Sequence, residues 1–186
     1  MTEEIMLSIE NLKVHFPIKT RSFSAPKSFV HAVDGIDLKI AKGKTFGIVG
    51  ESGSGKTTTA LAVMRLVPIT SGAITLGDQR LDGLIGEELR RARRHMQIIF
   101  QDPYSSLNPR VRAGAIVREP MDLMDVGRKS EREDRVAELF RQVGLHPEQQ
   151  GLFPHQFSGG QRQRIGVARA LASQPDLVVC DEPVSA

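Results

Sequence analysis

The chain has 186 residues, of which 40% are hydrophobic and 25% charged, and its net charge is only +3. This composition is typical of a globular domain with a real core, and no apolar run approaches the roughly 18 residues that cross a bilayer. The acidic, alternating N-terminus is no secretory signal, and a single cysteine, Cys180, excludes an internal disulfide and fits a cytosolic protein.

The first hundred residues predict strands followed by an alternating strand and helix pattern. Apolar residues alternate with polar ones in two early segments, which indicates two strands separated by a polar loop over residues 17–28. We expect strands over 5–16, 31–40, 44–50, 72–81 and 97–100, and helices over 56–66 and 87–96. The strand over 44–50, with the sequence KTFGIVG, is expected to be buried.

Residues from about 102 to 157 have a different character and predict a helical insertion. Ser130 and Glu133 have the spacing of a capping box. Four apolar residues then follow at helical spacing, and Gly144 supplies a stop; they are Val136, Leu139, Phe140 and Val143. The chain closes with a predicted helix ending before Pro175 and a buried strand over 177–180.

The segment from Gly50 to Thr57 fits the pattern G-x-x-x-x-G-K-[ST] between a predicted strand and a predicted helix. Glycines allow such a loop to turn its backbone amides toward a polyphosphate, and the following helix adds its positive N-terminus. We expect Lys56 to reach the β- and γ-phosphates and Thr57 to hold Mg²⁺.

Two acidic residues, Asp181 and Glu182, follow the last predicted strand. A carboxylate at a strand end beside a phosphate loop can hold Mg²⁺, and a second one can polarise the attacking water. Gln101 also follows a short strand and could reach the metal or the water, although an amide at this place is more often an ordinary loop residue.

The segment Phe157–Gln161, FSGGQ, opens a helix and is a candidate for a second anion site. Ser158 is a good N-cap, and the glycines after it leave backbone amides uncovered. Because the first loop already holds one γ-phosphate, two such helix starts suggest two chains that share nucleotides. The alternative is a simple helix cap.

Four motifs occur in one order: GESGSGKTT, IIFQD, FSGGQRQR and LVVCDEP. The set resembles the ATP-binding subunits of ABC transporters, where these are the Walker A loop, the Q-loop, the signature motif and Walker B. The resemblance implies an α/β P-loop NTPase core with an N-terminal antiparallel β part and a helical insertion. We divide this partial ATPase domain, residues 1–186, into the β part and Walker A core (1–101), the helical insertion (102–157), and the signature helix with the Walker B strand (158–186).

The resemblance also implies roles for individual residues. Gln101 would sense the γ-phosphate and face membrane subunits, and Glu182 would be the general base. Mg²⁺ would be held by Thr57, Gln101 and Asp181. The phosphates would be bound by Gly50, Ser52, Gly53, Ser54, Gly55, Lys56, Thr57 and Thr58. Ser158, Gly159, Gly160 and Gln161 would cover the nucleotide of a partner chain.

Family members stack adenine on an aromatic side chain near the first strand, for which Phe16 is our candidate and Phe29 the second choice. Phe16 could equally be a core residue. In the family, the sequence after DEPVSA continues into a D-loop, a histidine that contacts the γ-phosphate, and further strands. We therefore expect this sequence to be the N-terminal part of a longer protein that is a poor ATPase alone, with the Walker A strand left at an unpaired edge.

Further short segments, including HFPI and QDPYSSLNPR, resemble those of the dipeptide and oligopeptide importers. The implied function is ATP hydrolysis that drives peptide uptake, at the cytoplasmic face of the inner membrane. The implied partners are two permease subunits, a second ATPase subunit and, indirectly, an extracytoplasmic peptide-binding protein, without nucleic acid. Import of nickel or glutathione, nucleotide binding without turnover, and a non-transport role on DNA or ribosomes remain alternatives.

Overall fold

The computed structural model describes residues 3–18, 28–100 and 107–181. Contacts between Cα atoms divide the chain into two compact units, residues 1–89 and 90–186, which are described separately below. Among the described helices, none combines the length and apolar character needed to cross a bilayer.

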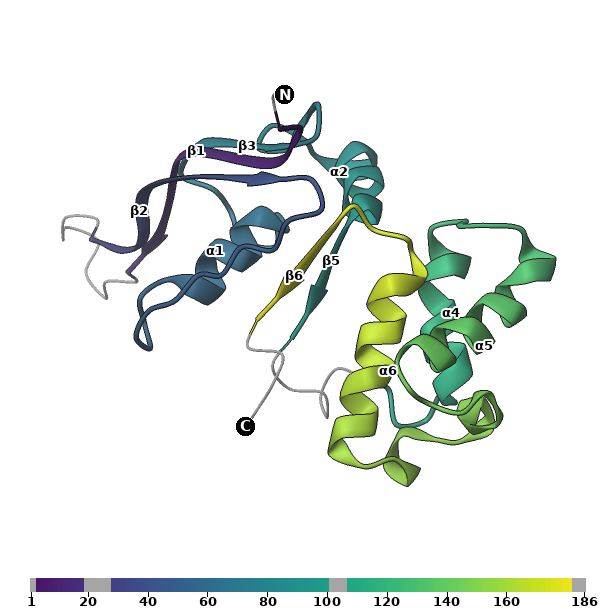
Figure 1. The fold of residues 1–186 in the computed structure, drawn as a ribbon. Helices are drawn as coiled ribbons and strands as arrows, with labels where there is room; N and C mark the ends of the chain where they lie inside the picture. Colours follow the sequence, from purple (N-terminus) through teal and green to yellow (C-terminus); the bar gives the residue numbers. More distant parts are fainter. Residues whose placement is uncertain (1–2, 19–27, 101–106, 182–186) are drawn as a thin grey trace. The chain divides into compact units, whose positions relative to one another are not determined.

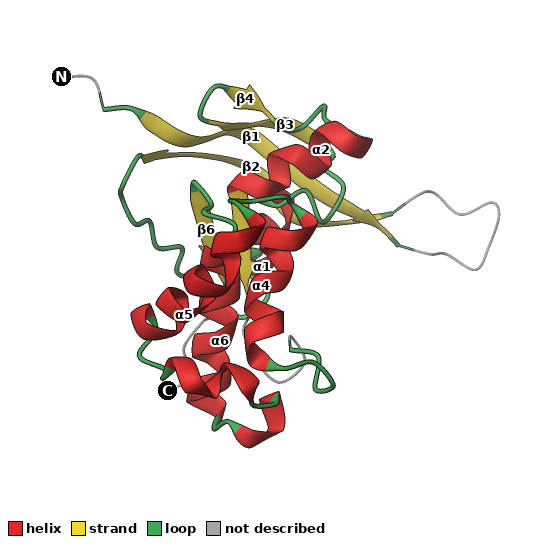
Figure 2. Cartoon of the chain, turned by 90° about the vertical axis from the view of Figure 1, so that its right-hand side faces the viewer, coloured by secondary structure: helices red, strands yellow, loops and turns green. Residues whose placement is uncertain are grey.

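The first unit is built around a sheet with the strand order β2-β1-β3-β4 (Figures 1 and 2). Strands β1 (Ile5–Pro17) and β2 (Phe29–Ala41) form the long antiparallel pair that the alternating pattern predicted. The segment expected as one strand over 72–81 is instead a hairpin of β3 (Ser71–Leu76) and β4 (Gln79–Arg80). The unit also contains α1 (Lys56–Val63) and α2 (Gly86–Ala92).

Alternate residues of β1 form the buried side of this sheet, which explains why the segment is a strand. Leu12 and Val14 are fully buried, and Leu7 and Ile9 are nearly so. They share this side with Ile74 of β3, which pairs with Ile9 across the strands. The polar residues between them face outward, as a half-buried strand requires.

The expected buried strand over residues 44–50 is wrong. The structure has no strand there, and the whole segment is exposed; the side chains of Phe46, Ile48 and Val49 are 52%, 47% and 96% exposed. An apolar run becomes a strand only when a neighbouring strand pairs with it. The described ladders of this unit involve β1 to β4 and leave residues 44–50 outside the sheet.

The second unit combines a two-stranded parallel ladder with a group of helices (Figure 1). Strand β5 (Met96–Ile99) follows the short helix η1 (Arg93–His95), and it pairs in register with β6 (Leu177–Cys180). The two strand starts are joined twice, because the Asp176 amide donates to the His95 carbonyl oxygen at 2.9 Å and the Asp176 carboxylate lies 2.7 Å from His95 Nδ1.

The core of the second unit lies between α4 (Ala113–Leu123), α5 (Arg132–Gln142) and α6 (Gly159–Ala172). The short helices η2 (Lys129–Glu131), η3 (Pro147–Gly151) and η4 (Pro154–Gln156) connect them. The predicted apolar stripe is confirmed, since Val136, Leu139 and Phe140 are buried in this core. The predicted stop is also confirmed, with Gly144 at a φ of 71°.

The predicted capping box at Ser130 and Glu133 is wrong. Ser130 lies in η2, and α5 begins at Arg132 with Glu131 at its N-cap and no side-chain cap hydrogen bond. The Arg132 side chain, 3% exposed, orders this turn instead. Its guanidinium donates to Asp122 Oδ1 at 2.9 Å, to Asp125 Oδ1 at 2.7 Å and to two backbone carbonyl oxygens, those of Val126 and Gly127.

Candidate functional site

The phosphate loop, residues 50–58, runs into the N-terminus of α1 and is organised by its own lysine. Lys56 Nζ donates to the carbonyl oxygen of Gly50 at 2.7 Å and to that of Glu51 at 2.8 Å. The ammonium therefore lies over the mouth of the loop with its charge satisfied by carbonyl oxygens. An anion entering the loop would offer a stronger, charge-assisted partner at the same place.

Two glycines allow the backbone of this loop to take the conformation that it has. Gly53 and Gly55 have φ angles of 84° and 92°, in the left-handed region that other residues rarely adopt. Gly55 is also the N-cap of α1, with its carbonyl oxygen accepting from the Thr59 amide at 2.8 Å and from Thr59 Oγ1 at 3.0 Å. The bend at Gly55 thus starts the helix and turns its first amides toward the loop, the arrangement that binds phosphate.

The loop is open to solvent along most of its length. Ser52, Gly53, Ser54 and Thr57 are exposed, and Lys56 and Thr58 are half-buried. A hydroxyl such as that of Thr57, at the start of a helix behind a phosphate loop, is an oxygen donor of the kind that Mg²⁺ prefers. The exposed residues of the loop are therefore accessible to a ligand from solvent.

Asp181 follows β6 directly, as predicted. Its amide donates to the carbonyl oxygen of Ile99 at 2.9 Å, which extends the parallel ladder by one residue and fixes the backbone of Asp181 at the strand end. Its side chain is half-buried. The strand itself is less buried than expected, since its three valine and leucine residues are half-buried and Cys180 is exposed.

The predicted helix start at Ser158 is confirmed as a reciprocal cap of α6. Ser158 Oγ accepts from the Gln161 amide at 3.3 Å, and Gln161 Oε1 accepts from the Ser158 amide at 3.0 Å. Gly160 is exposed, and a Cβ added there would meet no atom within 4 Å. The first two residues of this helix, Gly159 and Gly160, therefore carry no side chain that could cover their backbone amides.

The remaining predicted residues divide into two groups. Gln101 and Glu182 lie outside the described residues. Phe16 and Phe29 are both described, and each pairs with a residue of the other strand, Phe16 with Val30 and Phe29 with Pro17. Phe16 is half-buried and Phe29 exposed, so the choice between them for an adenine contact stays a prediction.

The structure places these residues in both units of the chain. The phosphate loop and the two phenylalanines belong to residues 1–89, whereas Ser158 and Asp181 belong to residues 90–186. The predicted site is therefore built from separate parts of the sequence, each with its own local support.

Comparison with known proteins decides the family. A family model described as "ABC transporter" matches residues 33–185, which include the phosphate loop, Ser158 and Asp181. The chain belongs to the ABC transporter family. The α/β fold expected for an ATP-binding cassette is confirmed by the structural matches below.

Relatives of this ABC transporter chain include ATP-binding proteins named for oligopeptide transport and for glutathione import. It is 45% identical over 185 residues to the oligopeptide transport ATP-binding protein AppF of Bacillus subtilis, covering 99% of this chain and 56% of AppF. It is 46% identical over 183 residues to the glutathione import ATP-binding protein GsiA of Pectobacterium atrosepticum, covering 98% of this chain and 29% of GsiA. The chain thus spans at most little more than half the length of these relatives.

Solved structures resemble it closely in fold. A dimeric post-hydrolysis state of the ATP-binding cassette MJ0796, bound to ADP and Pi, superposes with a TM-score of 0.80 at 28% identity, covering 96% of this chain and 75% of that one. The cbiO1 protein of Clostridium perfringens superposes with a TM-score of 0.78 at 24% identity, covering 65% of that chain, and supports the fold alone.

Proposed function

We propose that this ABC transporter chain binds Mg·ATP at residues 50–58 and belongs to an ATPase that drives import of peptides. The observation that carries the proposal is the position of Lys56, whose ammonium lies 2.7 Å from the Gly50 carbonyl oxygen at the mouth of a loop that starts a helix. This geometry supports the proposal of a phosphate site at which the lysine is already positioned.

The roles of the site residues follow from their chemistry. Backbone amides of the loop and the Lys56 ammonium would hold the β- and γ-phosphates, and Thr57 and Asp181 would supply oxygen atoms to Mg²⁺. Glu182 would polarise the attacking water, and Gln101 would contact the metal or the γ-phosphate. The adenine would stack on Phe16, with Phe29 as the second choice.

We further propose that two ATPase domains close head to tail on ATP. The uncovered helix start at Ser158 supports this, because it offers amides and a hydroxyl to an anion although the chain already has a complete phosphate loop. The dimeric arrangement of the MJ0796 cassette bound to ADP and Pi is consistent with it. In this proposal, Ser158, Gly159, Gly160 and Gln161 cover the partner's nucleotide.

The proposed setting is a membrane importer. Two permease subunits would read the closing and opening of the ATPase pair from the cytoplasmic face of the inner membrane, where the chain would be peripheral. The name and 45% identity of AppF favour peptides as cargo. Glutathione, itself a tripeptide, is the second candidate because GsiA is similarly related, at 46% identity.

Isothermal titration calorimetry with Mg·ATP tests the nucleotide site. Lys56→Ala should lose at least tenfold in affinity, because a charge-assisted phosphate contact disappears. Lys39→Ala, which removes an exposed lysine of β2, is the matched control and should bind like the unchanged chain. Equal affinities for the chain and Lys56→Ala would overturn the assignment of the loop.

The cargo needs a separate test in cells. Disruption of the gene for this chain should abolish uptake of labelled dipeptides and oligopeptides, and re-expression should restore it. Loss of glutathione uptake with normal peptide uptake would select the second candidate. Normal uptake of both would contradict a role in importing either.

A further inference from the structure

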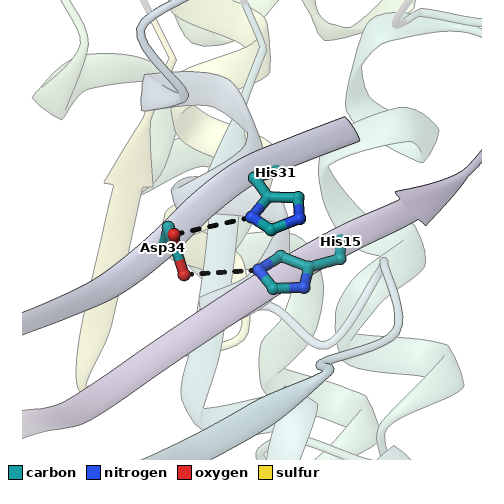
Figure 3. A group of neighbouring side chains, drawn as sticks. All are labelled: His15, His31 and Asp34. Atoms are coloured by element: carbon teal, nitrogen blue, oxygen red, sulfur yellow. Dashed lines mark hydrogen bonds and ion pairs between the residues drawn. The ribbon is translucent and has the colours of Figure 1, made fainter. Parts of the chain in front are cut away.

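Three side chains of the first unit that have no part in the proposed nucleotide site lie together on β1 and β2: His15, His31 and Asp34 (Figure 3). His15 Nε2 lies 3.4 Å from Asp34 Oδ1, and His31 Nδ1 lies 3.5 Å from Asp34 Oδ2. The two imidazole rings are stacked, with centroids 3.9 Å apart and planes 17° from parallel.

The pairing of the two strands explains this cluster. His15 stands opposite His31 in the antiparallel ladder, and Lys13 stands opposite Asp34. Directly opposed residues have their Cβ atoms about 5 Å apart, which brings two imidazoles into contact. The ladder also shifts register between Val14 and His15. The histidines are therefore held side by side by the backbone and not only by their own contact.

The cluster offers donors typical of a metal site. One ligand atom from each of the three residues lies within 4.8 Å of the others. Zinc binds imidazole nitrogen and carboxylate oxygen at about 2.0–2.2 Å, so tetrahedral ligand atoms lie about 3.4 Å apart. Each imidazole nitrogen already lies at about this distance from one oxygen of the Asp34 carboxylate, His15 Nε2 at 3.4 Å from Oδ1 and His31 Nδ1 at 3.5 Å from Oδ2. In addition, Nε2 of His15 is buried, and its contact among the described residues is the Asp34 carboxylate oxygen 3.4 Å away.

We propose that His15, His31 and Asp34 bind a divalent transition-metal ion, with zinc as the best fit to two imidazoles and one carboxylate. Magnesium is a poor fit because it prefers a shell of oxygen ligands, so this site is distinct from the proposed Mg·ATP site. Water would complete the coordination, since His31 and Asp34 are 54% and 51% exposed.

Two adjustments must accompany binding. The nitrogen lone pairs of stacked rings are parallel and do not converge, so the exposed His31 ring must turn to share a metal with His15. The Lys13 ammonium, 3.3 Å from Asp34 Oδ1, must also give up its ion pair. Both changes involve side chains that are at least one-third exposed, and neither requires the strands to move.

A bound metal would have a structural consequence for this sheet. It would tie the end of β1 to the start of β2, and its ligand His15 directly precedes Phe16. A ligand that binds only the folded state stabilises it by mass action. Metal would thereby raise the stability of the β1–β2 pair without taking part in hydrolysis.

The test is a titration of the whole chain with ZnCl₂ in buffer free of magnesium and nucleotide. Calorimetry gives the affinity, and NMR of the imidazole resonances identifies the ligands. His15→Gln and His31→Gln should each weaken zinc binding by at least tenfold. His146→Gln, which removes an exposed histidine of the second unit, should bind zinc like the unchanged chain.

The NMR readout distinguishes this site from zinc bound elsewhere. The resonances of His15 and His31 should shift together at the first equivalent, while that of His146 stays in place. Unchanged resonances of His15 and His31 at one equivalent, or equal affinities for the chain and His31→Gln, would overturn the proposal. Circular dichroism confirms that each variant is folded, which the exposure of His31 favours.

Lys13→Gln provides a variant expected to gain affinity. Removing a unit charge at ion-pair distance from Asp34 should tighten zinc binding by about tenfold, the factor for such an interaction in water. Unchanged or weaker binding by Lys13→Gln would contradict Asp34 as a ligand, because no competition for its carboxylate would then exist.

Discussion

The carbonyl oxygen of Ala32 in β2 lies against Gly55 so closely that a Cβ built on Gly55 would be 2.4 Å from it. Real Cβ atoms essentially never approach an oxygen so closely, and Gly55 also has a φ of 92°. The phosphate loop is therefore seated on the central sheet of its unit through a contact that only glycine permits.

This contact predicts different outcomes for two glycines of one loop. Gly53→Ala meets no atom within 4 Å and should cost only the strain of its positive φ, about 1 kcal/mol. Gly55→Ala must also push the loop away from Ala32, so its loss of stability should be at least twice as large, with a loss of Mg·ATP affinity. Urea denaturation and calorimetry of the two variants check this; equal effects would contradict it.

Arg132 predicts a stability effect in the second unit. Its buried guanidinium satisfies Asp122, Asp125 and two carbonyl oxygens in the turn before α5. Arg132→Met keeps much of the side-chain volume but leaves these acceptors without their donor, so the melting temperature should fall by roughly 4–8 °C. Arg128→Met, at a residue 83% exposed beside Glu131, is the control and should change it little.

The pH dependence of stability should show the contribution of Asp82. The Arg80 guanidinium, hydrogen-bonded at 2.9 Å, lowers the pKa of the Asp82 carboxyl below its usual value, and the Ile74 amide also donates to it. A lowered pKa in the folded state stabilises the protein above the unfolded pKa near 4, and this contribution disappears as the pH falls through the folded value.

Asp82→Asn should accordingly be less stable than the unchanged chain at pH 7, by about 1 kcal/mol. The difference should shrink as the pH falls below about 4, where the carboxyl of the unchanged chain becomes protonated. Denaturation curves at several pH values measure it. Asp78→Asn, an exposed neighbour, is the control; a constant difference for Asp82→Asn across pH would show that charge is not the cause.

Ser158 can be tested with two substitutions that both keep a good N-cap. Asn and Asp each accept the Gln161 amide, so α6 should begin normally in both variants. Ser158→Asp adds a negative charge where we propose the partner's phosphate, so ATP-dependent dimerisation should be lost. Ser158→Asn should retain more of it. Light scattering with ATP measures both, and equal dimerisation would contradict a phosphate contact at Ser158.

The local features of the proposed nucleotide site could be predicted because each depends on residues close in sequence. The loop before Lys56, the cap at Ser158 and the strand before Asp181 all follow from motifs shorter than ten residues. The absence of a strand over residues 44–50 could not be predicted in this way. The apolar pattern of this segment fits a buried strand, but pairing depends on neighbours that the pattern does not contain.

The histidine cluster shows the same limit. His15 and His31 lie in two segments that were correctly predicted as strands, yet nothing in either segment says that they face each other. Only the register of β1 against β2, with its irregularity between Val14 and His15, brings them together. A one-residue slip would place one ring on the other face of the sheet. The predicted capping box at Ser130 was wrong for a related reason. The buried Arg132 fixes the conformation of that turn through contacts with α4, which lies outside the local motif.

One helix separates the residue proposed to touch the partner's nucleotide from the residue proposed to serve the chain's own metal ion. Ser158 caps the start of α6, whose 14 residues span about 21 Å, and residues 173–176 lead directly into β6 and Asp181. Because α6 is packed into the core with α4 and α5, it should transmit displacement rather than absorb it. In a closed dimer, release of phosphate at one nucleotide would then displace α6 and, with it, the residue proposed to serve the metal ion at the other nucleotide. This coupling would allow the two sites to hydrolyse ATP alternately.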